Sequence, residues 1–166
     1  MKNRIDEIRN NHNHALAEQV MASFEWRKIN GWFAPTRAAA LTRVMDLVPE
    51  GSTVSQGGSV TLDQCGIREA LQRRTDITFL DPYNPDLERS VQLENRRKGL
   101  LADVYVTGSN AITRDGTIVN RDGMGNRVAA LSFGPKKVVI VVGMNKIVPD
   151  LDSAILRIDQ VASPMN

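Results

Sequence analysis

A short polar loop at residues 122–127 holds the side chains best suited to chemistry: one carboxylate, one guanidinium and one amide, separated by two glycines. The Arg127 guanidinium can bind a carboxylate or phosphate through two hydrogen bonds, and Asp122 can act as a general base or accept hydrogen bonds from hydroxyl groups. The alternative is an Asp122–Arg127 ion pair that braces a long loop. Because packing does not explain so polar a run before a predicted helix, we favour a binding site. Its predicted ligand contacts are Asp122, Gly123, Gly125, Asn126 and Arg127, with Asp122 the candidate catalytic residue.

A second candidate is the glycine-rich segment 57–59, which joins a predicted strand to a predicted helix. Small residues let a ligand approach the backbone closely, and unpaired N–H groups at a helix N-terminus attract phosphate or carboxylate. The segment lacks the lysine of a Walker loop and the three-glycine spacing of a dinucleotide-binding fingerprint. A tight turn that needs glycine for its backbone angles explains it equally well. The candidate contacts are Gly57, Gly58, Ser59 and Thr61, and Thr61 has capping-box spacing with Gln64.

Three more polar side chains follow apolar strands: Asn110, Asn145 and Lys146. Asn110 can contact a ligand, although the residues alone favour a role in satisfying local backbone groups. Lys146 can neutralise a phosphate or carboxylate, although a surface lysine is the default interpretation. In open parallel sheets ligands bind beyond the carboxyl ends of the strands. We therefore expect all these candidate residues to face the 122–127 loop across one cleft.

The elements that position these loops alternate between strands and helices. This pattern predicts an α/β fold: an open, mostly parallel sheet with helices on both faces. Segments 111–113 and 117–119 flank Asp115-Gly116 and predict a β-hairpin. The predicted strands are 53–56, 77–80, 102–107 and 137–142, and the predicted helices are 36–47 with Thr36 as its cap, 61–74 with a break at Gly66, 87–100 and 127–133.

Two further helices are predicted towards the ends of the sequence. Apolar residues up to Phe24 have helical spacing, but the polar segment 10–14 predicts an interruption, so residues 1–24 form a peripheral segment. Residues 151–161 predict a surface helix, with Leu151, Ile155 and Ile158 on its apolar stripe.

Length and charge place limits on the class of protein. At 166 residues the chain fits one domain, residues 1–166, and its 21 basic and 19 acidic residues are too balanced for a nucleic-acid partner. The densest basic cluster, 96–98, follows Glu88 and Glu94 and indicates a solvated, charge-compensated helix face. The single cysteine, Cys65, excludes an internal disulfide or a Cys-rich metal site within this chain, so we expect no cofactor here.

The N-terminal sequence and the lengths of the apolar runs bear on the location of the protein in the cell. The sequence has no signal-peptide pattern and no apolar run long enough to span a bilayer, so we expect a cytoplasmic protein. The residues leave the oligomeric state open, and an oligomer is compatible with them.

Several motifs, in this order, resemble one family. They are Gly57-Gly58-Ser59-Val60-Thr61-Leu62, Thr107-Gly108-Ser109-Asn110-Ala111-Ile112, Asp115-Gly116, Asn120, Asp122-Gly123, Gly125-Asn126-Arg127, Gly134-Pro135-Lys136 and Gly143-Met144-Asn145-Lys146-Ile147-Val148. Together they resemble the lactate-utilisation (LUD) domain, over a match that runs from about the first helix to residue 166. The resemblance implies a NagB/RpiA/CoA-transferase-like fold and a bacterial role in lactate oxidation. It further implies a short family member that has no iron–sulfur domain and acts with a separate iron–sulfur partner.

Within that fold, residues 57–59 resemble the phosphate loop of sugar-phosphate isomerases and deaminases. Residues 107–125 are similar to a run in methylthioribose-phosphate isomerases and related initiation-factor subunits. The sequence departs from that pattern because Asn110 replaces the acidic residue, and Cys65 does not occupy a recognised catalytic position. The departure argues against isomerase chemistry.

Three functions fit these expectations. The first is a non-redox component of a lactate-oxidising iron–sulfur system that binds a small anionic ligand. The second is an independent enzyme acting on a sugar phosphate or acyl-CoA, an isomerase or transferase, with Asp122 as acid or base and Arg127 or Lys146 holding the anion. The third is a regulatory ligand-binding module without chemistry.

Overall fold

The computed structural model describes residues 2–165, with side chains from residue 4 onwards. The chain folds into two compact units, each with its own sheet. The terminal unit consists of Met1–Phe33, Asn110–Asn120 and Gly143–Asn166, and the parallel-sheet unit of Ala34–Ser109 and Arg121–Val142. The prediction of one domain over the whole chain stays a prediction.

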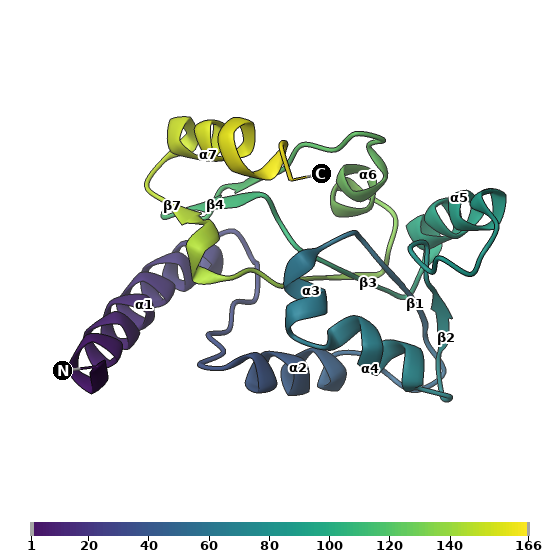
Figure 1. The fold of residues 1–166 in the computed structure, drawn as a ribbon, viewed down its shortest axis with the longest axis horizontal. Helices are drawn as coiled ribbons and strands as arrows, with labels where there is room; N and C mark the ends of the chain where they lie inside the picture. The colour runs from purple at the N-terminus through teal and green to yellow at the C-terminus, as the bar shows by residue number, and fades with distance from the viewer. Residues whose placement is uncertain (1, 166) are drawn as a thin grey trace. The chain divides into compact units, whose positions relative to one another are not determined.

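The parallel-sheet unit is built on four strands in the order β2-β1-β3-β6 (Figure 1). Every neighbouring pair is parallel, with Val54 opposite Val104 and Tyr105 opposite Val138, which confirms the predicted open parallel sheet. The β-branched runs that indicated strands form them because branched side chains suit a pleated, buried surface. The strands are β1 (Thr53–Gln56), β2 (Thr78–Leu80), β3 (Val104–Thr107) and β6 (Lys137–Ile140).

One face of this sheet packs against three helices through a core whose fully buried side chains are aliphatic. Side chains alternate between the two faces of a strand, so Val54, Val104 and Val106 point the same way. They form a buried core with Ile67 and Leu71 of the covering helices. The helices are α2 (Arg37–Asp46), α3 (Val60–Gln64) and α4 (Ile67–Arg73). Thr36 caps α2 as predicted, its hydroxyl accepting from the Ala39 N–H at 3.1 Å.

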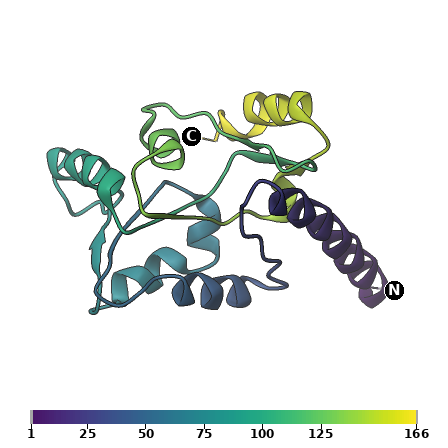
Figure 2. The same ribbon diagram turned by 180° about the vertical axis from the view of Figure 1, so that it is seen from behind.

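The opposite face carries Ser55, Tyr105 and Thr107, all buried. Gly99 lies against it, since a Cβ there would come within 2.6 Å of Ser55 Oγ. The covering elements are α5 (Arg89–Lys98), the 3-10 turn η1 (Gly99–Leu101) and α6 (Asn126–Ser132). Figures 1 and 2 show α2 and α4 on one side of β1 and β3, and α6 on the other. Helices therefore cover both faces, as the sequence predicted.

The terminal unit contains a small sheet in the order β5-β4-β7. Its β4–β5 pair is antiparallel, and Gly116 in the turn has a φ of 82°, which confirms the predicted hairpin and explains its glycine. The third strand pairs in parallel with β4 and was not predicted, because two residues are too short for a periodicity. The strands are β4 (Ala111–Thr113), β5 (Ile118–Val119) and β7 (Ile147–Val148), the last preceded by the turn η2 (Met144–Lys146).

The first helix, α1 (Lys2–Glu25), is continuous, so the predicted interruption at 10–14 is wrong. Residues 10–12 of that stretch are exposed, and their polar side chains can stay hydrated while the backbone remains helical. Ala17, Val20 and Phe24 are buried in the second half of the helix. Tertiary packing of one face therefore outweighs the weak helix propensity of the polar segment.

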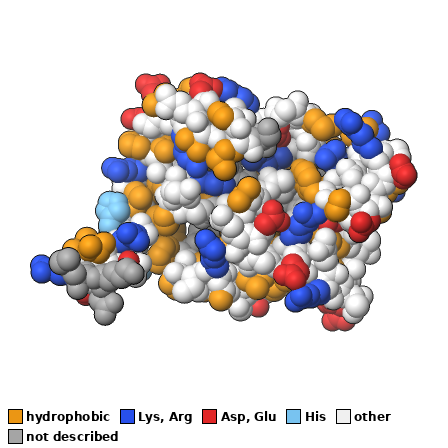
Figure 3. Space-filling view, viewed as in Figure 1, with side chains coloured by type: hydrophobic (Ala, Val, Ile, Leu, Met, Phe, Trp, Pro, Cys, Tyr) orange, Lys and Arg blue, Asp and Glu red, His pale blue; other side chains and the backbone are white. Residues whose placement is uncertain are grey.

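The last helix, α7 (Leu151–Arg157), runs into a π-helical turn, η3 (Ile158–Ala162). Its predicted apolar stripe is only partly right: Ile158 is buried, but Leu151 is 51% exposed and Ile155 42%. Hydrophobic side chains, drawn in orange, accordingly lie on the surface over α7 (Figure 3). The fully buried residue of the helix is Ala154, because a small side chain lets α7 lie close to β4. The spacing of large apolar side chains therefore did not predict the buried face of α7.

Candidate functional site

Gly57 and Gly58 follow β1 directly and lie against side chains that approach very closely. A Cβ on Gly57 would overlap Thr107 Oγ1 and lie 3.2 Å from the Tyr105 hydroxyl. A Cβ on Gly58 would meet the Tyr83 ring at 3.1 to 3.2 Å. Neither glycine has a left-handed φ. The close approach of neighbouring side chains, rather than an unusual backbone angle, therefore accounts for both glycines.

Ser59 is the residue before α3, so the predicted capping box from Thr61 to Gln64 is wrong. The helix begins at Val60, and its N-terminus has no side-chain cap. The Ser59 hydroxyl instead packs near Gly108, where a Cβ would approach it to 2.5 Å. Among the residues described, this buried hydroxyl has no hydrogen-bond partner. The capping prediction failed because the chain turns into the helix one residue before Thr61.

Asp122 and Arg127 form an ion pair, with the carboxylate 9% and the guanidinium 11% exposed. The Arg127 Nε–H donates to Asp122 Oδ1 at 2.8 Å, and its Nη2 donates to the Arg121 carbonyl at 3.0 Å. The second carboxylate oxygen accepts from the Val128 N–H at 2.7 Å. This geometry matches the bracing interpretation, since it ties the loop to the first turn of α6. The ligand-binding and general-base roles of these two residues stay predictions.

The glycines of this loop differ from each other. Gly125 has a φ of 79° and stands immediately before α6, where a side chain would be strained. Gly123 has no atom within 4 Å of a Cβ built on it, so its position is open. Asn126, the first residue of α6, hydrogen-bonds the Tyr105 side chain. The predicted loop thus contributes one amide to the polar face of the sheet.

Tyr105 is a residue that the motif analysis missed. It is 2% exposed, and burial raises the pKa of its hydroxyl well above the usual range, with Tyr83 and Asp122 acting in the same direction and Arg127 and Asn126 opposing. The hydroxyl is protonated at neutral pH, as in any tyrosine, and the raised pKa extends that state to more alkaline pH, so it can donate a hydrogen bond. Its place between valines in an apolar strand was the available signal, because alternation puts it on the face opposite to theirs.

Asp81 at the end of β2 is a second residue that was missed. Its carboxylate is 7% exposed and accepts hydrogen bonds from Gln56, Arg68, Gln72 and the Tyr83 N–H, at 2.9 to 3.2 Å. Such a satisfied buried carboxylate rigidifies the loop that follows it. Its position directly after a strand was the signal, since carboxyl ends of parallel strands collect functional side chains.

In the terminal unit, Arg157 joins two predicted site residues through their carbonyl groups. It donates to the Asn110 carbonyl at 2.6 Å and to the Asn145 carbonyl at 3.2 Å, and burial lowers the pKa of its guanidinium. The Asn110 N–H donates to the Asn120 side chain at 3.1 Å. Lys146 ends the turn before β7, its N–H bonded to the Gly143 carbonyl. The structure thus brings together Asn110 and Asn145 in this unit, and the single cleft joining all predicted residues stays a prediction.

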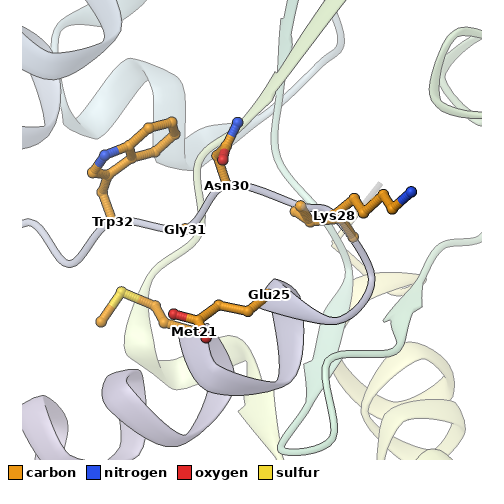
Figure 4. A pocket seen from close by; sticks show the side chains of 7 residues that line it. Met21, Glu25, Lys28, Asn30, Gly31 and Trp32 are labelled. Atoms are coloured by element: carbon orange, nitrogen blue, oxygen red, sulfur yellow. The ribbon is translucent and has the colours of Figure 1, made fainter.

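A pocket of about 400 Å³ lies beside the end of α1, in the terminal unit. Met21 and Glu25 come from the helix, and residues 28–32 form the returning segment. In Figure 4 the Glu25 and Met21 side chains lie on one side of Gly31, Trp32 lies on the other, and Lys28 points away. This pocket shares no residue with the predicted site.

The part of the chain that the structure describes has neither a cluster of metal-ligating side chains nor a membrane-spanning helix. Within it, no group of three or more His, Cys, Asp or Glu side chains is arranged to hold a metal ion. No helix in that part is both long and apolar enough to cross a bilayer. Cys65 is half-buried and ends α3.

Comparison with known proteins identifies one family. The family model described as the LUD domain matches residues 17–166. No curated protein matches the chain. The match covers the parallel-sheet unit completely and most of the terminal unit, including every predicted site residue. At the family level the LUD domain points to lactate utilisation. The chain therefore belongs to the LUD-domain family.

Proposed function

We propose that this chain is a ligand-binding, non-redox component of a lactate-utilisation system. The family supports lactate utilisation as the general process. We assign electron transfer to a separate iron–sulfur protein, because iron–sulfur clusters are held by several cysteine thiolates and this chain has one cysteine. Its own task is to bind a small organic anion such as a 2-hydroxy acid.

The observation that supports this proposal best is the protonated Tyr105 hydroxyl beside Gly57 and Asn126. Like any tyrosine hydroxyl it is neutral at physiological pH, and burial, which raises its pKa further, leaves it able to offer a proton to an acceptor. Gly57 brings the backbone close to that hydroxyl, and the Asn126 side chain hydrogen-bonds it. Neutral donors that converge in a dry environment suit the carboxylate and hydroxyl oxygens of a hydroxy acid.

An acid–base enzyme acting through Asp122 has less support. Both of its carboxylate oxygens already accept hydrogen bonds, one from Arg127 and one from the Val128 N–H. To take a proton from a substrate, the carboxylate would have to give up one of these partners. A binding role needs no such rearrangement.

Binding is tested with the purified protein and four probes: L-lactate, D-lactate, pyruvate and inorganic phosphate. A ligand that binds only the folded state raises the melting temperature, by an amount equivalent to about 2.7 kcal/mol at a hundred times its Kd. We expect lactate or pyruvate to raise it in the wild type and to do so less in Tyr105→Phe. Sodium chloride at equal ionic strength is the control. A wild-type protein that none of the four stabilises contradicts the proposal.

The place of the protein in the system is tested in cells. Deletion of the chain should abolish lactate oxidation in cell extracts, and restoring the wild-type chain should bring it back. An affinity-tagged chain should co-purify with an iron–sulfur protein. Unchanged lactate oxidation after deletion excludes the proposed role, whatever the purified protein binds.

A further inference from the structure

Three arginines of the parallel-sheet unit lie near the residues that follow its strands. They differ in whether a carboxylate neutralises the guanidinium. Arg127 is paired with Asp122 and Arg68 with Asp81, both in largely buried contacts. Arg96, on α5, is half-buried and has no carboxylate partner among residues 4–165. Its positive charge is therefore available to a ligand, whereas that of Arg127 is already balanced.

Arg96 is held in place by an aromatic ring and a thioether. Its guanidinium carbon lies 5.2 Å from the centre of the Tyr83 ring, within the range of a cation–π contact. Its Nη1 lies 4.0 Å from the sulfur of Met124, which belongs to the predicted 122–127 loop. The side chain thus connects α5 to two of the loops that surround the polar face, although the sequence indicated only a solvated helix surface.

Tyr83 ties Arg96 to the glycine segment. The Tyr83 ring lies so close to Gly58 that a Cβ there would touch it at 3.1 Å. The tyrosine backbone is fixed on both sides, because its N–H donates to Asp81 at 2.9 Å and its carbonyl accepts from Arg68 at 2.5 Å. Gly58 itself is exposed. The Tyr83 ring, held by its fixed backbone, therefore contacts both the Arg96 guanidinium and the exposed Gly58.

We propose that Arg96, stacked on Tyr83, binds the carboxylate group of the ligand, an inference that rests on the proposed function and names the residue that recognises the anion. A guanidinium is planar by its own bonding, and contact with a ring fixes the orientation of that plane, so that two of its N–H groups can match a planar carboxylate. Met124 is 64% exposed beside it and offers an apolar contact to the carbon chain of the acid. The site therefore selects a short organic carboxylate over inorganic phosphate.

The test compares Arg96→Gln with Arg97→Gln by titration calorimetry, using L-lactate, pyruvate and inorganic phosphate as probes. The two substitutions remove the same charge from adjacent positions, and Arg97 is a matched control because its side chain is exposed and lies 3.7 Å from that of the exposed Glu94. A charge-assisted hydrogen bond is worth about ten- to a hundredfold in affinity. We expect Arg96→Gln to weaken lactate or pyruvate binding by about that factor, and Arg97→Gln to change it less than about twofold.

The outcomes of these titrations distinguish recognition by Arg96 from the alternatives. If Arg96→Gln and Arg97→Gln weaken binding equally, only the overall charge matters. If Arg96→Gln binds as the wild type does, another group recognises the carboxylate. Either result overturns the inference and leaves the proposed function standing. Tighter binding of phosphate than of either acid overturns the ligand class. A wild type that binds none of the three probes overturns both proposals. Arg96→Lys keeps the positive charge but loses the planar arrangement of N–H groups, so it should bind the acid with intermediate affinity. This variant keeps the inference testable if Arg96→Gln does not fold.

Discussion

The two faces of the parallel sheet are buried to a similar degree, but they are built from different chemistry. Val54, Val104 and Val106 are at most 1% exposed on one face, and Ser55 and Tyr105 are at most 2% exposed on the other. The first face gains its stability from apolar area removed from water, which depends on volume. The second requires particular donors and acceptors, since an unsatisfied buried polar group is costly. Burial therefore does not separate the core from the candidate site in this unit, whereas polarity does.

This difference explains why the loops around the polar face are rich in glycine and in paired charges. The backbone of the glycine segment must approach the tyrosine and threonine side chains closely. The charged side chains of the loops must be paired because they are buried away from water. The apolar face makes neither demand, and its helices carry ordinary aliphatic side chains. Substitutions on each face, and in the loops beside the polar one, should therefore act through different physical causes.

Leu71→Ala probes the apolar face. Leu71 is fully buried in the aliphatic core, and removing its branched end leaves a cavity, so the free energy of unfolding should fall by about 2 to 5 kcal/mol. Leu101→Ala is the control, because Leu101 is 83% exposed and should change stability by less than about 0.5 kcal/mol. Urea denaturation measures both. Similar losses for the two variants would show that the core has been wrongly placed.

Asp122→Asn probes the ion pair beside the polar face. The amide keeps an acceptor for the Val128 N–H but removes the negative charge that faces the largely buried Arg127 guanidinium, so the loss should be about 2 to 3 kcal/mol. Asp46→Asn, at an exposed position of α2, should have little effect. Chemical denaturation of both variants gives the comparison. A stable Asp122→Asn protein would mean that the pair does not brace the loop.

Gly57→Ala probes the close approach at the glycine segment. The added methyl group would overlap Thr107 Oγ1, and the resulting shift should cost about 1 to 3 kcal/mol and weaken ligand binding. Gly123→Ala is the matched control, since its Cβ would enter open space. Thermal unfolding with and without L-lactate distinguishes the two effects. Equal behaviour of both alanine variants would remove the steric explanation for Gly57.

Tyr105 should produce a small pH effect. Its pKa in the folded state lies above the ordinary value of about 10, so the folded protein retains a proton that the unfolded chain loses. The free energy of unfolding should therefore fall as pH rises above about 10, and Tyr105→Phe should remove that part of the loss. Stability measured across alkaline pH, with tyrosinate absorbance recorded in parallel, gives the readout. An identical pH dependence in the two proteins contradicts the assignment.

Much of the parallel-sheet unit was predictable because its signals are local. In that unit the strand at 53–56, the β-branched run at 137–140 and the Thr36 cap each depend on neighbours in the chain, and so does the Asp115-Gly116 turn of the terminal unit. The same local reasoning failed where distant contacts decide. The polar segment 10–14 is helical because residues further along α1 are packed, and α7 buries Ala154 because only a small residue lets it lie close to β4.

Residue type and spacing along the chain were enough to predict the family, most of the strands and helices, and the polar loops that surround the candidate site. Only the tertiary structure decided which charges remain available. Arg127 and Asp122 neutralise each other, Asp81 takes up Arg68, and Arg96 lies on Tyr83 without a carboxylate among the described residues. The physical reason is that a charge is balanced by whatever lies within a few ångströms of it, and separation along the sequence does not specify that distance.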